Sequence, residues 1–346
     1  MIQATDQNSF DLSHQISGAA VSLVPGTDQT GAVPGDPIVQ EILQQAVECL
    51  QDRNSTLQAV DKTLEQVVHL LDQRRTSSTR ENWWEFVDWI RQHPIRHLVH
   101  QDPLTRHAFE QPQGPATRGA WLDYVYSAEH GWSLSDMTWI GRRINRWTME
   151  APFCRANRAR REVFAQYIDD VSRHHRGAEV MALGAGHLRE AEFSTAINRG
   201  HLGRMLAIDS QPDNLVSLRR EYDRFGLTTL ESSTPELVSE GVALGHFDLI
   251  YASAMCDESC DSDCQELTEA LFRKLKPGGK LLLTSLPNPK SWAGFMEAFM
   301  NWEVVYRERT RMMALTAGIP DSDLGEISYF PSNDQSVCFF SIARAV

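Results

Sequence analysis

Two glycines and a more distant aspartate are the residues of this sequence best suited to hold a ligand that carries a ribose. Gly184 and Gly186 flank Ala185 between an apolar run and a segment with a helical pattern, and Asp209 ends the next apolar run. Glycine permits a sharp turn and lets a ligand come close to the backbone. A carboxylate at the end of the following strand can accept hydrogen bonds from both ribose hydroxyls. The spacing therefore predicts an adenosine-binding site.

The same stretch limits which adenosine compound is expected. A dinucleotide fingerprint has a third glycine that allows close packing of helix on strand, and Arg189 occupies that position. This counts against NAD and FAD without excluding them. The sequence contains no GxxxxGK[ST] motif, so a P-loop nucleotide site is excluded.

The elements that must position these residues alternate between strand and helix after residue 176. Apolar runs predict strands at 179–183, 204–209, 227–231, 247–253 and 279–285. Amphipathic segments predict helices at about 188–198, 212–223 and 264–275. Two further runs, 326–330 and 336–343, flank a turn-rich segment and predict a β-hairpin. We therefore expect an α/β fold with a Rossmann-like, doubly wound, mostly parallel seven-stranded sheet that ends in a hairpin.

The first half of the chain has a different character. Residues 1–36 are rich in Gln, Ser, Gly and Pro and predict a flexible leader, and residues 37–175 predict an α-helical domain ahead of the sheet domain, 176–346. Pro37 and Leu57 open two amphipathic segments that suit an antiparallel helical hairpin. Its apolar stripe fits a packed subdomain, which we favour, or a homodimer interface.

A later part of the helical region carries many arginines. Residues 113–131 read as a loop followed by a short aromatic segment, and residues 135–172 as one or two helices. We expect most of the arginines on those helices to form a solvated face paired with acids. They are Arg142, Arg143, Arg146, Arg155, Arg158, Arg160 and Arg161.

Four motifs in the second half resemble a known family. "VMALGAGHL", "LAIDSQ", "FDLIYAS" and "LKPGGKLLL", in this order, are similar to class I methyltransferases that use S-adenosylmethionine, and the resemblance covers about residues 178–346. "GHLREAE" and the upstream "HQDPLTRHAFE…LDYVY" resemble a bacterial subgroup with a helical N-terminal extension. That subgroup includes 3-hydroxy fatty acid methyl ester synthases.

The resemblance implies a set of residues around S-adenosylmethionine. The glycine-rich loop would lie along the methionine part and ribose, the acid would bind ribose, a serine after the third strand would lie beside adenine, and the end of the fourth strand would face the methyl group. The matching residues here are Gly184, Ala185, Gly186 and His187; Asp209 and Ser210; Ser232 or Ser233; and Tyr251, Ala252 and Ser253.

The sequence also departs from the family. Many members carry an acid two residues before the first glycine, where this chain has Ala182, so another group or water must hold the amino group of the cofactor. The subgroup often has a Tyr-rich segment where this chain reads Cys256-Asp257-Glu258, and "GYAGDA" where it reads "GPATRGA" at 114–120. Both departures fall where a substrate would be held, so the acceptor can differ from a fatty acid.

Candidate catalytic residues follow from the chemistry of methyl transfer. A carboxylate acceptor needs no base, only a cationic clamp such as Arg118. A hydroxyl or amine acceptor needs a base, and Asp257 and Glu258 are the nearest by position. The alternative for Asp257 and Glu258, together with Asp261 and Asp263, is a solvated acidic loop that caps the next helix. Tyr124 and Tyr126 could flank the sulfonium with their ring faces or simply belong to the core.

Composition narrows the remaining possibilities. A net charge of −13 over 346 residues disfavours a nucleic-acid partner, and no apolar run approaches the length of a membrane span. The N-terminus has no basic region followed by an apolar core, so we expect a cytoplasmic location. The six cysteines are expected to be reduced there. Without a CxxC pair no metal is expected, and Cys256, Cys260 and Cys264 could share one helix face.

These observations favour an S-adenosylmethionine-dependent methyltransferase that acts on a small-molecule acceptor, with oxygen ranked before nitrogen or sulfur. The helical N-terminal domain is expected to form a lid or wall over the acceptor. Two alternatives stay open: a non-catalytic, cofactor-binding regulatory module and an NAD(P)-dependent oxidoreductase.

Overall fold

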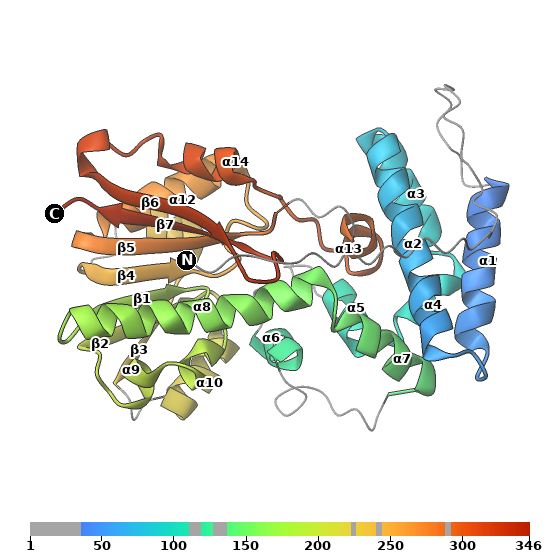
Figure 1. The fold of residues 1–346 in the computed structure, drawn as a ribbon, viewed down its shortest axis with the longest axis horizontal. Coiled ribbons are helices and arrows are strands. Elements are labelled where there is room, and N and C mark those ends of the chain that lie inside the picture. Colours follow the sequence, from blue (N-terminus) through green and yellow to red (C-terminus); the bar gives the residue numbers. More distant parts are fainter. Residues whose placement is uncertain (1–35, 111–118, 127–136, 223–225, 240–243, 288–291) are drawn as a thin grey trace, which may run out of the picture. The chain divides into compact units, whose positions relative to one another are not determined.

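The second half of the chain folds around one sheet. A computed structural model describes residues 36–110, 119–126, 137–222, 226–239, 244–287 and 292–346. In these residues seven strands join in the order β3-β2-β1-β4-β5-β7-β6 (Figure 1). The strands are β1 (Glu179–Leu183), β2 (Arg204–Asp209), β3 (Leu227–Glu231), β4 (Phe247–Ala252), β5 (Leu275–Ser285), β6 (Leu324–Pro331) and β7 (Cys338–Arg344).

Strands β1 to β5 run parallel, and β7 lies antiparallel between β5 and β6. The predicted fold class is therefore confirmed, including the terminal hairpin. Every residue of β4 is buried, as expected for a parallel strand with helices over both faces. Strand β1 has β2 on one side and β4 on the other, so the chain reverses its direction of sheet growth there. Ligands of such sheets bind at this position, beyond the carboxyl ends of the strands.

Helices cover both faces of the sheet. One face carries α8 (Pro152–His174) and α10 (Pro212–Tyr222), whose apolar side chains share a core with Val180, Leu249 and Tyr251. The other carries α12, packed with Met181 and Ile250. The helices that follow β1 are α9 (Thr195–Asn198), α10 (Pro212–Tyr222), α11 (Thr234–Val238), α12 (Asp261–Arg273), α13 (Ala293–Phe299) and α14 (Arg309–Met313), with 3-10 turns η3 (Arg189–Glu192), η5 (Ala314–Thr316) and η6 (Asp321–Asp323).

The N-terminal half is helical, as predicted. It consists of α1 (Pro37–Gln51), α2 (Leu57–Ser77), α3 (Arg80–Ile90), α4 (Pro94–Val99), α5 (Pro103–Glu110), α6 (Gly119–Tyr126), α7 (Trp139–Thr148) and α8 (Pro152–His174). Helices α1 and α2 pack against each other, and α2 also packs on α13. Asp72 fixes that contact because its carboxylate accepts from the Trp292 and Gly294 amides at 2.7 and 2.8 Å. No described helix meets the length and apolarity that crossing a bilayer would require.

Three details differ from the sequence-based expectation. The helix predicted at 188–198 is split into η3 and α9, because Leu188 has a left-handed backbone (φ 52°) and Ser194 starts a new helix with its side chain. The helical spacing of apolar residues after Pro37 puts Ile38 on the apolar stripe of α1, but Ile38 is 57% exposed, and Val39 is buried instead. Arg160, expected in a solvated face, is only 1% exposed.

Candidate functional site

The loop after β1, residues 184–188, is here called the glycine loop. Gly184 has φ 65°, and a Cβ there would lie 3.0 Å from the Met255 sulfur and 3.3 Å from the Ser253 carbonyl oxygen. The amides of Gly184 and Ala185 both donate to the Ile208 carbonyl, at 2.9 and 3.1 Å. A residue with a side chain at 184 would therefore push the loop away from the neighbouring strand ends.

Asp209 lies at the centre of the site. Its Oδ2 accepts from the Gly186 amide at 2.8 Å, and its Oδ1 accepts from the Gln211 amide at 2.8 Å and from Asn214 Nδ2 at 3.2 Å. Burial raises the pKa of this carboxyl, and the three donors oppose the rise. A carboxylate offers about four acceptor positions, so one ribose hydroxyl can bind without loss of a protein donor. A second hydroxyl would have to displace Asn214, the longest of the three contacts.

The predicted adenine-side residues follow the end of β3. The Ser232 amide donates to the Asp209 carbonyl at 3.2 Å, so the two strand ends adjoin. The Ser232 hydroxyl is directed to Glu236 at 3.2 Å, and Ser233 forms a capping box with the same glutamate at the start of α11. Ser210 is exposed directly after Asp209. The side chains of Ser232 and Ser233 thus stabilise the start of α11, and the Ser232 amide bonds to the backbone of Asp209.

Helix α6 lies directly against the glycine loop. A Cβ on Gly119 would come within 2.5 Å of the His187 ring, and the Gly119 amide donates to Asn214 Oδ1 at 3.2 Å. Asp123 accepts from His187 Nδ1 at 2.8 Å and from Arg189 at 2.7 and 2.9 Å. Burial acts to raise the pKa of Asp123, and the bonds from Arg189 and His187 outweigh it, so the pKa is lowered.

The arginine at the third glycine position thus has a structural explanation. Arg189 donates two bonds to Asp123 and two, of 2.8 and 3.0 Å, to Glu221 of α10. A glycine would let helix and strand pack closely, whereas Arg189 joins α6 to the sheet domain. Sequence reasoning missed Asp123, and the only signal for it was the acid in the quoted "LDYVY".

The aromatic residues of α6 do not both present free ring faces. Tyr124 is buried, and the guanidinium of Arg161 lies over the ring of Tyr126 at 4.6 Å from its centroid. Arg118 belongs to 111–118, outside the described residues. At the end of β4, Tyr251 is buried, and its hydroxyl donates to Glu190 Oε1 at 2.6 Å. Ala252 is also buried, and the Ser253 amide donates to the Leu183 carbonyl at 3.3 Å.

The loop after β4, residues 253–260, is here called the β4 loop. Cys256 and Cys264 form a disulfide across it, with their Cα atoms 5.6 Å apart. The expectation that all cysteines are reduced is therefore wrong, as is the expectation that Cys256, Cys260 and Cys264 share a helix face. The chain turns through Ala254, with φ 57°, and α12 starts only after Cys260, which brings the two sulfurs together.

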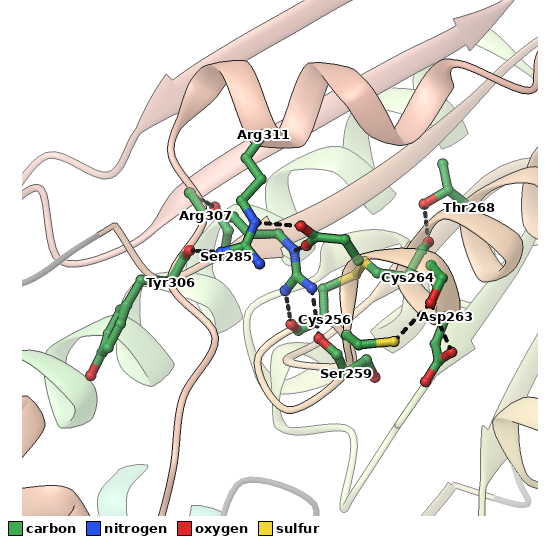
Figure 2. A network of polar contacts seen from close by, with 12 residues as sticks. Cys256, Ser259, Asp263, Cys264, Thr268, Ser285, Tyr306, Arg307 and Arg311 are labelled. Atoms are coloured by element: carbon green, nitrogen blue, oxygen red, sulfur yellow. Dashed lines mark hydrogen bonds and ion pairs between the residues drawn. A yellow bond between two sulfur atoms is a disulfide. The ribbon is translucent and has the colours of Figure 1, made fainter. Parts of the chain in front are cut away.

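Arg307 holds the same loop from the other side. It donates to the carbonyls of Cys256 and Ser259 and to Asp261, as Figure 2 shows, and Arg311 also binds Asp261 at 2.6 Å. Asp261 and Asp263 lie in the first turn of α12. These two acids therefore fit the helix-capping alternative.

The two candidate bases have different surroundings. Asp257 is 1% exposed, and its Oδ2 accepts from Arg160 at 2.5 Å. Burial raises the pKa of Asp257, and the charges of Arg160 and Arg307 oppose that rise. Glu258 reaches solvent, yet crowding by protein atoms and then the charge of Asp257 raise its pKa to about 7. Glu258 is thus the one whose pKa suits proton transfer near neutral pH.

Comparisons with known proteins establish a relationship of fold. No family model matches the chain, and no curated protein matches its sequence. The solved structure of a possible exported protein from Bordetella parapertussis aligns with a TM-score of 0.53 and 17% identity, over 66% of this chain and 80% of that one. At this identity the similarity supports the fold alone.

Solved methyltransferase structures are also similar to the chain. The N-methyltransferase NodS from Bradyrhizobium japonicum WM9, in complex with S-adenosyl-l-homocysteine, aligns with a TM-score of 0.39 and 14% identity, over 54% of this chain and 87% of that one. SAM-bound CalS10, an amino pentose methyltransferase from Micromonospora echinaspora, aligns with a TM-score of 0.41 and 13% identity, over 56% and 97%. Neither alignment carries an argument about activity.

Proposed function

We propose that this protein is an S-adenosylmethionine-dependent methyltransferase that acts on a small-molecule acceptor. The observation that carries the proposal is the 2.8 Å bond between the Gly186 amide and Asp209. It joins the glycine loop, which lacks a side chain at 184 and 186, to the acid that we propose binds ribose, at the point where the order of the sheet reverses. The strand order with its antiparallel β7, and the family motifs, favour this cofactor over a dinucleotide.

The residues present fit the cofactor. Asp209 retains one acceptor position for a ribose hydroxyl, and the glycine loop next to it has no side chain at 184 or 186, although α6 covers Gly186 in this structure. Ser232 continues the site towards the place of the adenine. When bound, S-adenosylmethionine supplies a methyl group that the sulfonium has already activated, so the protein needs no covalent nucleophile. The protein has to orient the acceptor, exclude water and remove a proton where the acceptor carries one.

Glu258 is the candidate base in this proposal. Its raised pKa keeps an accepted proton available for release near neutral pH, and its side chain reaches solvent. Asp257 instead orients the β4 loop through Arg160. Oxygen is the first-ranked acceptor atom on the subgroup resemblance, with nitrogen or sulfur as alternatives. A carboxylate acceptor would need no base and would depend on a cation such as Arg118.

Helix α6 is proposed to be the lid of this site. It contacts the glycine loop through Gly119 and is tied there by Asp123. Because α6 packs so closely on His187, we propose that cofactor entry and release require α6 to move away. The rest of the N-terminal helices would then form the wall of the acceptor site.

Calorimetric titration with S-adenosylhomocysteine tests the cofactor assignment. Asp209→Ala should weaken binding by roughly tenfold to a hundredfold, because a hydrogen bond to a charged group is worth about 1.5–3 kcal/mol. Asp213→Ala is the matched control, since Asp213 is an exposed acid in the first turn of α10. Equal affinity of the Asp209 variant and wild type would refute the assignment.

Turnover separates the enzyme from its alternatives. Cofactor labelled at the methyl group, incubated with the protein and a small-molecule cell extract, should yield a labelled product that the Asp209→Ala protein does not form. Binding of S-adenosylhomocysteine with no labelled product in any extract would favour a regulatory module. Binding of NADH in place of S-adenosylhomocysteine would favour an oxidoreductase.

A further inference from the structure

A second carboxylate follows the glycine loop in the chain and contacts β4, whereas Asp209 ends β2. Glu190 sits in η3, four positions after Gly186, and is 8% exposed. Its Oε1 accepts from the Tyr251 hydroxyl at 2.6 Å. Tyr251 of β4 is the register partner of Ala182 of β1, so the side chains of these two residues lie on the same face of the sheet, the face that Glu190 contacts.

Glu190 has a neutral partner and no ion pair within the described residues. The two nearby arginines have other contacts. Arg189 binds Asp123 and Glu221, and Arg161 approaches Glu192 at 3.8 Å while its guanidinium lies over the rings of Tyr126 and Phe193. A buried carboxylate without a cation is costly. Burial accordingly raises the pKa of Glu190.

The two carboxylates flank β1. Asp209 ends β2, and Glu190 is fixed through Tyr251 to β4, and these two strands are the neighbours of β1 in the sheet. A nucleoside held by its ribose at Asp209 would reach Glu190 only if its 5′ substituent crossed the end of β1. In S-adenosylmethionine that substituent ends in an amino acid, which carries an ammonium group.

We propose that Glu190, positioned by the Tyr251 hydroxyl, is the counter-charge for the ammonium of the amino acid part of the cofactor. This assignment rests on the proposed function and deepens it. The ligand would supply the cation that Glu190 lacks in the free protein. The ammonium and the Glu190 carboxylate would then pair in a buried position. Tyr251 is a positioning residue, since it acts only through Glu190.

Binding of two ligands can show whether Glu190 pairs with the ammonium or only stabilises the glycine loop. S-adenosylhomocysteine contains the amino acid, whereas 5′-deoxy-5′-methylthioadenosine keeps the nucleoside and thioether without it. In calorimetric titrations Glu190→Gln should weaken S-adenosylhomocysteine at least tenfold and change methylthioadenosine less than twofold. Tyr251→Phe should give the same selectivity with a smaller loss. Glu192→Gln, in the same 3-10 turn, should affect neither ligand.

Each other outcome has a distinct meaning. If wild type binds neither ligand, the proposed function fails. If wild type binds both and Glu190→Gln weakens both equally or neither, the function stands and the role of Glu190 is overturned. Should Glu190→Gln not fold, wild type alone still decides: the analogue of S-adenosylhomocysteine that lacks only the amino group should bind at least tenfold more weakly. Equal binding of that analogue overturns the inference.

Discussion

The β4 loop and the glycine loop lie at the same edge of the sheet and are stabilised in opposite ways. The β4 loop is closed by a disulfide, and its buried Asp257 carries its own cation, Arg160. The glycine loop is held by backbone hydrogen bonds and by contacts from α6. The buried carboxylate next to it, Glu190, has a tyrosine hydroxyl in place of a cation.

The contrast suggests that the β4 loop stabilises the fold and that the glycine loop binds the ligand. A charge that the protein compensates itself contributes to the fold and gains little from a ligand. A buried charge without a cation costs folding free energy in the free protein, and a cationic ligand recovers that cost on binding. We therefore interpret the β4 loop as a rigid wall and the glycine loop as the place where the ligand binds.

The largest expected effect is on the free energy of unfolding, and it should differ between variants of the two buried carboxylates, Asp257 and Glu190. Asp257→Asn should lower the free energy of unfolding by about 3–5 kcal/mol, because it leaves Arg160 buried without its counter-charge. Glu190→Gln should leave it unchanged or raise it, because the amide oxygen still accepts from Tyr251 and no uncompensated charge is buried. Urea denaturation of both variants measures the two values. Similar losses in both would remove the distinction between the loops.

The covalent closure of the β4 loop should have the next largest effect. Replacing both Cys256 and Cys264 by serine should cost about 2–3 kcal/mol, because the disulfide closes a short loop in the unfolded chain. Cys260→Ser, an exposed thiol in the same loop, is the control. Thiol titration of the unfolded, unreduced protein should count four free thiols. A count of six would show that the disulfide does not form.

Loosening α6 should change rates more than affinity. Asp123→Asn weakens the contacts to His187 and Arg189, so α6 should leave the glycine loop more easily. Stopped-flow fluorescence can follow this movement with Trp121 of α6 as the reporter. Association and dissociation of S-adenosylhomocysteine should both be roughly tenfold faster, because the substitution destabilises the closed position of α6 by about 1.5 kcal/mol. Asp213→Asn should leave both rates unchanged. A variant with wild-type rates would mean that α6 does not gate the site.

The smallest effect is a pH dependence. The pKa of Glu190 is raised on folding, so the folded state binds the proton more tightly than the unfolded state. The stabilisation from this group is present below its ordinary pKa of about 4.3 and is lost as pH rises, by at most about 1.4 kcal/mol per pH unit. Burial raises the pKa of Glu190, and the bond from Tyr251 and the charges of Arg161 and Arg189 oppose the rise. Burial and, next, the charge of Glu190 raise the pKa values of Tyr126 and Tyr251.

The Glu190→Gln variant isolates that contribution. Urea denaturation between pH 4.5 and 8 should show a free energy of unfolding that falls with pH more steeply in wild type than in the variant. Saturating S-adenosylhomocysteine should reduce the difference, because its ammonium favours the charged carboxylate. If the free energy of unfolding changed with pH in the same way in both proteins, Glu190 would not be a buried carboxylate that lacks a cation.

The sheet and the position of Asp209 next to the glycine loop could be predicted because their signals are local. Each strand, the pair of glycines and the acid at a strand end can be recognised from a stretch of a few residues, and Asp209 follows Gly186 at the expected distance of 23 positions. The side-chain pairs that distinguish the two loops are not local. Arg189–Asp123, Arg160–Asp257 and Tyr251–Glu190 join residues 66, 97 and 61 positions apart. Arg160 in particular has the sequence context of a solvated helix face, and only the packing of α8 on the sheet buries it.

A crystal structure of the protein with S-adenosylhomocysteine tests the central claim most directly. We expect the nucleoside beyond the carboxyl end of β1, a ribose hydroxyl within hydrogen-bonding distance of Asp209 and the ammonium closest to Glu190. A ligand bound elsewhere, or a glycine loop that stays covered by α6 at saturating ligand, would contradict the account.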